Sequence, residues 1–260
     1  MSEFLLGASL VAYFIASALY LANLHLKHKQ LAAYGTVAAI AGFSLQTLRL
    51  ILQTLNQSTP FANASEAIFF LSWAIAGLYL AILAWYRLPS VGSLAMPLAV
   101  VALALVYRFP TPAGGPLAGD GWMRIHVVAI ITSFALFTLA FCCAVFYLIQ
   151  NKLLKSKRMT GMFRRLPPLK TIDSLGYHLA SIGFPLLTLG IITGIVGVEM
   201  ARMRDTGAEI KLVTSAITWF AYAAYMVAHS SPGWRGKKAN WILIVGALLT
   251  ALTTALHKFS

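Results

Sequence analysis

Long apolar segments constrain the fold of this chain more than any other feature. A helix that crosses the roughly 30 Å hydrocarbon core of a bilayer needs about 20 mostly apolar residues. The sequence offers eight such runs, separated by short polar or basic joints. A β-barrel would instead show period-two alternation in segments of about ten residues. The pattern therefore predicts an all-α polytopic membrane protein with helices over residues 4–24, 31–53, 64–86, 91–109, 124–150, 174–198, 212–229 and 240–257.

The distribution of charge predicts which side of the membrane each joint faces. A formal net charge of +13 is compatible with a nucleic-acid partner. The basic residues, however, gather at alternate joints, as is typical of loops held in the cytoplasm. With an outer N-terminus, the inner joints contain thirteen of the twenty Lys and Arg residues and one of the seven acidic residues. We therefore predict eight spans with both termini outside, and no nucleic-acid partner.

The chain is expected to form a single integral membrane domain over residues 1–260. Its longest inner joint, 151–171, is basic and contains two prolines, which predicts a cytoplasmic linker between the fifth and sixth spans. The chain contains no Walker or Rossmann glycine pattern, and such patterns cradle phosphates in nucleotide-binding proteins. An ATP-driven pump is therefore disfavoured.

Small residues in the fifth and sixth spans have two interpretations. Gly190 and Gly194 form a GxxxG pair, which indicates either close packing against another helix or a surface smooth enough for a flat ring. Cys142 and Cys143 are adjacent in the middle of the fifth span. Free cysteines behave as small hydrophobes, so we interpret this pair as packing residues.

Four of the six histidines fall at the predicted membrane boundaries. His126 opens the fifth span and His257 closes the eighth, so both belong to the outer boundary; His178 and His229 belong to the inner one. Ionisable residues within a membrane usually face the bundle interior or a bound group, and imidazole is a good axial ligand for haem iron. Two imidazoles from neighbouring helices could hold one porphyrin. The alternative is that these are interfacial residues bonded to water or backbone.

Other ionisable residues lie in the predicted outer layer. Arg108 and Arg124 share it with His126, and a guanidinium fork suits carboxylates such as haem propionates. Arginine near a helix end also commonly extends to the headgroups. Glu66 follows Asn63 with the spacing of a capping box, so its simplest role is to complete a helix N-terminus.

Several segments of the chain resemble a known family. They are residues 63–73 (Asn-Ala-Ser-Glu-Ala-Ile-Phe-Phe-Leu-Ser-Trp), His126 with the nine residues after it, Asp173 to Gly194, Trp219, His229, residues 233–238 (Gly-Trp-Arg-Gly-Lys-Lys), and Leu256 with His257. Together they resemble the cytochrome c assembly proteins of the CcsA type, and within these the short HemX-like and YpjD-like members.

This resemblance implies roles for particular residues. In the family, two outer histidines flank a tryptophan-rich loop and ligate haem b, which assigns those roles here to His126 and His257. The histidine before Gly-Trp-Arg-Gly is linked to an inner haem site, which implies a role for His229. His178 is added as its partner from its position alone. The joint over 198–211 contains no tryptophan, which argues against full cytochrome c synthase activity.

We therefore expect a haem b-binding protein of the bacterial cytoplasmic membrane without catalytic residues. HemX-like proteins are associated with haem handling during cytochrome c maturation and with regulation of the tetrapyrrole pathway. The expected partners are haem, the lipid bilayer, and a cytochrome c maturation protein or glutamyl-tRNA reductase. Two alternatives stay open: a membrane subunit of a haem lyase, and a cofactor-free scaffold that docks a cytoplasmic partner through its basic inner joint.

Overall fold

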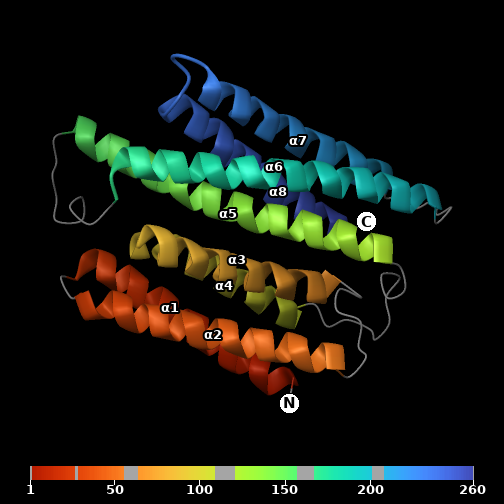
Figure 1. Ribbon diagram of the computed structural model, residues 1–260, viewed down its shortest axis with the longest axis horizontal. Coiled ribbons are helices and arrows are strands. Elements are labelled where there is room, and N and C mark those ends of the chain that lie inside the picture. The colour runs from red at the N-terminus through yellow and green to blue at the C-terminus, as the bar shows by residue number, and fades with distance from the viewer. Residues whose placement is uncertain are drawn as a thin grey trace. The chain divides into compact units, whose positions relative to one another are not determined.

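All regular structure in the described part of the chain is helical (Figure 1). The computed structural model describes residues 2–26, 29–55, 64–108, 121–156, 167–200 and 208–259. The helices in these ranges are α1 (Ser2–His25), α2 (Lys29–Leu55), α3 (Ala64–Tyr86), α4 (Pro89–Arg108), α5 (Gly121–Lys155), α6 (Leu169–Met200), α7 (Ala208–Ser230) and α8 (Lys237–Phe259). Each contains most of one predicted span, so the all-α prediction is confirmed.

The helices have the length and surface of membrane spans. In the described residues, segments within α1 to α6 are long and apolar enough to cross a membrane. Large hydrophobic side chains also point outward, among them Phe4, Trp85 and Phe220, as expected where lipid rather than water surrounds the protein. The chain is a multi-pass membrane protein. Helices α7 and α8 have 23 residues each, or about 34 Å at 1.5 Å per residue, and their function as a seventh and an eighth span stays a prediction.

The helices form two compact units, α1 to α4 and α5 to α8. In the first unit, α1 packs on α2 and α4, and α3 packs on α4 and α2. Helix α3 ends at Tyr86, the next residue, Arg87, has a φ of 52° in the left-handed region, and α4 begins at Pro89. The predicted linker over 151–171 is shortened, because α5 continues to Lys155 and α6 begins at Leu169. Residues 157–166 of that linker lie outside the described residues.

Buried hydroxyl groups in the first unit are bonded across helices. Tyr13 donates to Gln46 Oε1 over 2.6 Å, and Trp73 Nε1 donates to Thr47 Oγ1 over 2.9 Å. Such bonds are needed because a polar group that loses water without a new partner costs several kcal/mol. They connect α1 to α2 and α2 to α3.

An ion pair also joins α2 to α3. Arg49 Nη2 lies 3.1 Å from Glu66 Oε1, and the guanidinium sits 4.2 Å from the ring centre of Phe69. The sequence indicated a capping role for Glu66, and the structure adds this second role. Asn63, the other half of the predicted capping box, lies outside the described residues.

The second unit is built around the contact between α5 and α6. Glycines on α6 allow α5 to approach closely, since a Cβ at Gly183 would lie 2.9 Å from Phe137 Cε1 and a Cβ at Gly190 would overlap Ile130. Helix α5 therefore occupies the glycine surface of α6, which supports close packing and excludes the flat-ring interpretation there. Cys142 and Cys143 are fully buried in α5, and Gly176 of α6 packs on Cys143, as their interpretation as packing residues requires.

The predicted topology can be tested with reporter fusions. A fusion of alkaline phosphatase to the C-terminus should be active and a fusion of green fluorescent protein should be dark, because eight spans with an outer N-terminus bring the C-terminus outside. A fusion after Ser156 should behave in the opposite way. A fluorescent C-terminal fusion would contradict the eight-span topology.

The glycine contact of the second unit predicts the effect of a single methyl group. Gly183→Ala should lower the free energy of unfolding by about 1–3 kcal/mol, because the new Cβ has to displace Phe137 from a packed interface. Ile182→Ala, one residue away on an exposed face, is the matched control and should change it by less. Unfolding midpoints of the purified protein in detergent measure both, and equal effects would contradict the assigned interface.

Candidate functional site

The histidine sites of the second unit lie at two levels along α6. His126 contacts Gly190, and His229 contacts Asp173. Gly190 follows Asp173 by 17 positions, which correspond to about 26 Å of helix at 1.5 Å per residue. This is close to the roughly 30 Å thickness of a hydrocarbon core. His126 and His229 therefore lie at two levels of the second unit, and the assignment of these levels to the outer and inner membrane boundaries stays a prediction.

At the first level, side chains of α5 donate to backbone carbonyls of α6. Trp122 Nε1 donates to the Thr193 carbonyl over 3.1 Å, and Ser133 Oγ donates to the Gly183 carbonyl over 3.0 Å. Between them, His126 Nδ1 lies 2.7 Å from the Gly190 carbonyl oxygen. The carbonyls at Gly183 and Gly190 can be reached because glycine has no side chain to cover them.

This contact fixes the orientation of the His126 imidazole. A carbonyl oxygen only accepts, so Nδ1 carries the proton, and in the neutral ring Nε2 keeps its lone pair. The ring also lies on Gly194, where a Cβ would approach Cε1 to 2.7 Å. Metal-bound histidines typically donate their other N–H to a carbonyl or carboxylate in this way. The arrangement therefore leaves the lone pair of Nε2 free of any hydrogen bond from the described residues.

The structure describes only some of the other residues that were predicted to lie in the outer layer. Helix α8 packs along α5, and its C-terminal end lies at the same end of the second unit as the start of α5 (Figure 1). The side chains of His257 and Arg108 lie outside the described residues. Arg124 is exposed, and positions two apart point about 200° apart on a helix, so it points away from the α6 face that His126 contacts. Haem ligation by His257 and propionate binding by Arg108 and Arg124 stay predictions.

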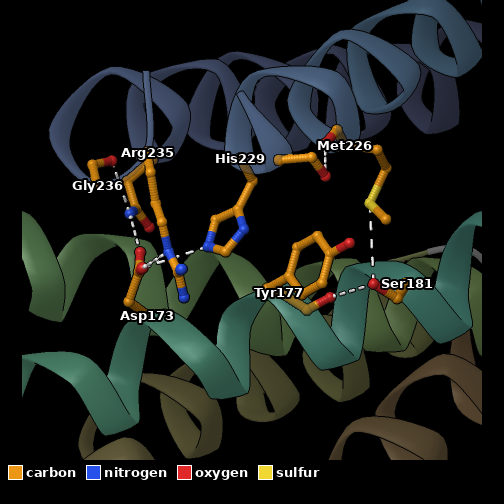
Figure 2. Close-up of polar contacts among 9 residues, drawn as sticks. Asp173, Tyr177, Ser181, Met226, His229, Arg235 and Gly236 are labelled. Carbon is orange, nitrogen blue, oxygen red and sulfur yellow. Dashed lines mark hydrogen bonds and ion pairs between the residues drawn. The ribbon is translucent and has the colours of Figure 1, made fainter. Parts of the chain in front are cut away.

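At the second level, one carboxylate brings three helices together (Figure 2). Asp173 of α6 accepts from His229 Nε2 over 3.2 Å and from Asn240 Nδ2 over 2.8 Å. Arg235 Nε lies 3.7 Å from the same Oδ2 atom that His229 contacts. Asp173, His229 and Asn240 are buried, whereas Arg235 is mostly exposed. This carboxylate cluster, made of these four residues, connects α6 to α7, to α8 and to the turn between them.

The turn between α7 and α8 depends on two glycines. Gly233 and Gly236 have φ values of 82° and 85°, which side chains disfavour. A Cβ at Gly236 would also lie 2.5 Å from Tyr147 Oη. The Gly236 carbonyl accepts from Asn240 Nδ2 over 3.0 Å. The Gly-Trp-Arg-Gly segment thus brings Arg235 and Asn240 to the carboxylate of Asp173.

The same cluster fixes the ring of His229. Tyr177, one helical turn after Asp173, stacks on the imidazole with ring centres 4.2 Å apart and planes at 13°, as Figure 2 shows. Because the Asp173 carboxylate only accepts, Nε2 carries a proton. In the neutral ring Nδ1 keeps its lone pair, and the described residues form no hydrogen bond to it.

His178 does not share the face of α6 that holds this cluster. Its side chain is exposed, and adjacent helical positions point about 100° apart, so it turns away from the direction of Tyr177. The contacts of His229 within the described residues are with Asp173, Tyr177 and Tyr225. Joint ligation of an inner haem by His178 and His229 stays a prediction.

The sequence analysis missed three members of the carboxylate cluster as site residues, Asp173, Arg235 and Asn240, together with Tyr177, which stacks on His229. One signal was available, because Asp173 is the single acidic residue on the predicted inner side. An unpaired carboxylate is unfavourable at a membrane boundary lined by hydrophobic helices, so a partner was to be expected. Tyr177 and Asn240 had no such signal, since their importance depends on how α7 and α8 fold against α6.

Comparisons with known proteins agree with this architecture. The sequence profile described as Cytochrome C assembly protein matches residues 61–260. A cytochrome c biogenesis protein CcsA from Gloeobacter violaceus is 28% identical, over 95% of this chain and 90% of its own length. Protein HemX from Brevibacillus brevis is 27% identical over 75% and 72% of the two chains, and CcsA from Mesostigma viride is 24% identical over 95% and 90%. No solved structure matches.

Fold and site together define a polytopic helical membrane protein with oriented imidazoles at two levels of one helix unit. The profile match covers well over half of the chain. The chain therefore belongs to the cytochrome c assembly family, as the resemblance of its segments predicted.

The carboxylate cluster predicts a stability change. Asp173→Ala should lower the free energy of unfolding by about 1–3 kcal/mol for each buried donor left without an acceptor. Asp173→Asn keeps an acceptor oxygen and should cost less. Denaturant unfolding in detergent, with tryptophan fluorescence as the probe, measures the order of the two variants. Equal stability of Asp173→Ala and the parent would show that the cluster does not hold the helices together.

Proposed function

We propose that this protein binds haem b within the cytoplasmic membrane of a bacterium and handles it during cytochrome c biogenesis. In this proposal His126 and His257 hold haem at the outer level, and His229, with His178 as its proposed partner, holds haem at the inner level. The bundle takes up haem at one level and presents it at the other. It forms no covalent bond to haem.

The orientation of His126 is the observation that carries this proposal. A histidine that binds a metal through one nitrogen typically donates its other N–H to a carbonyl or carboxylate. Here Nδ1 donates to the Gly190 carbonyl, and the described residues form no hydrogen bond to Nε2. When bound, haem supplies an iron atom that accepts such a lone pair. The donor chemistry of His126 therefore fits the group.

The inner level supports the proposal in a second way. His229 is buried, bonded at Nε2 and stacked by Tyr177, so its ring is held in one orientation. Pre-oriented ligands bind more tightly because less freedom is lost on binding. The name of the CcsA relatives, cytochrome c biogenesis protein, supports a place for this protein in cytochrome c maturation. The alternative to haem handling, for a chain similar to HemX, is regulation of the tetrapyrrole pathway.

An absorption spectrum tests the proposal directly. Protein purified in detergent from haem-replete cells should show a Soret band, and pyridine haemochrome analysis should identify haem b. His126→Ala and His229→Ala should each remove part of the band, because each deletes one axial ligand. The double variant should lose the band, because neither level then keeps its oriented axial ligand.

His25→Ala is the matched control. His25 is exposed at the end of α1 and belongs to neither level, so its loss should leave the Soret band unchanged. Haem-replete protein without a Soret band would overturn the proposal. A band that survives the double substitution would show that haem binds elsewhere.

A further inference from the structure

We propose that Gly190 and Gly194 of α6 are positioning residues that select Nε2 of His126 as the nitrogen available to haem iron. The carbonyl of Gly190 accepts the Nδ1 proton over 2.7 Å. Gly194 leaves the space that the imidazole needs to reach this carbonyl. The inference rests on the haem-binding function proposed above for His126 and deepens it. It gives the GxxxG pair a role beyond helix packing.

The two glycines lie against different parts of α5. A Cβ at Gly190 would overlap the side chain of Ile130, so this glycine admits the helix itself. A Cβ at Gly194 would instead lie 2.7 Å from Cε1 and 2.9 Å from Nδ1 of His126. Carbon atoms in ordinary contact are about 3.5–4.0 Å apart. The imidazole therefore occupies the place that a side chain at Gly194 would fill.

The segment of α5 that carries His126 is held on both sides. Trp122, about one turn before it, donates to an α6 carbonyl over 3.1 Å. Ser133, about two turns after it, donates to another α6 carbonyl over 3.0 Å. These bonds resist a shift of the whole helix. A methyl group added at Gly194 would therefore displace the imidazole itself, by roughly 1 Å if ordinary contact distances are restored.

The carbonyl of Gly190 decides which nitrogen keeps its lone pair. A carbonyl oxygen only accepts, so it is matched by the tautomer that has its proton on Nδ1. Without this acceptor the proton is free to occupy either nitrogen. Loss of the second partner of a metal-bound histidine costs about 10- to 100-fold in metal affinity. We expect Gly194→Ala to weaken haem binding through His126 to the same extent.

Rescue by free imidazole tests the role of Gly194. His126→Ala removes the ring and leaves its space open. Haem and imidazole added to this protein in detergent should restore the part of the Soret band that the substitution removed, once unbound haem is separated on a desalting column. If Gly194→Ala is added, the new methyl group fills that space. Rescue should then need about 10- to 100-fold more imidazole, the cost of a lost second partner.

Gly183→Ala is the matched control for this experiment. It also places a Cβ against an aromatic ring of α5, 2.9 Å from Phe137 Cε1, but at a distance from His126 along α6. In the His126→Ala background it should leave the concentration of imidazole needed for rescue unchanged. Equal effects of Gly183→Ala and Gly194→Ala would show a role in helix packing only and would overturn the proposal.

A second ligand tests the carbonyl of Gly190 without any further substitution. N-Methylimidazole has the lone pair of imidazole but no N–H, so it cannot donate to this carbonyl. It should rescue His126→Ala about 10- to 100-fold less well than imidazole. Equal rescue by the two ligands would overturn the role of the carbonyl. This comparison also decides the question if the Gly194→Ala protein does not fold, as judged from its unfolding midpoint.

The outcomes separate this inference from the proposed function. If the parent protein contains no haem that depends on His126, the outer level of the proposed function fails and this inference fails with it. If such haem is present and imidazole rescues His126→Ala equally well with and without Gly194→Ala, the inference alone is overturned. A complete lack of rescue in His126→Ala would also overturn it, because the open space should accept the free ring.

Discussion

A carboxylate buried among apolar helices has to be met by hydrogen-bond donors, and the second unit is arranged around this requirement. Asp173 would be costly if the helices separated, because each donor and acceptor would then face hydrocarbon. His229 and Asn240 supply the donors from α7 and α8. The turn that carries Arg235 has to bring α8 back along α7 for this to happen. One side chain thus determines how three helices and their connection are joined.

At the level of His126, hydrogen-bond donors on α5 need acceptors, and α6 supplies them. Where α6 has glycines, its carbonyls are available to donors from α5, and His126 and Ser133 use them. In membranes such close approach replaces the hydrophobic effect as the source of helix association. Helix α6 therefore carries the hydrogen-bond acceptors of both imidazoles, a carbonyl at one level and a carboxylate at the other.

Much of the architecture was predictable because hydrophobic length is a strong signal. The runs over 4–24 and 64–86 became α1 and α3 almost residue for residue, and His126 was recognised from its place at a span boundary. The function of Gly190 was predictable only as two alternatives. Whether a helix or a flat ring packs against a glycine depends on which element lies beside it. No local sequence pattern specifies that element. Asp173 was overlooked for a related reason, since its partners come from helices 56 and 67 residues further along the chain.

The sequence by itself determined that the chain is a helical membrane protein of the cytochrome c assembly family, with histidines at two predicted boundaries. These properties follow from residue type and spacing, which act locally. Only the tertiary structure decided which imidazole nitrogen is bonded and which is left as a donor. That choice depends on whether a carbonyl or a carboxylate lies within hydrogen-bonding distance, and such neighbours exist only after α5 to α8 have packed.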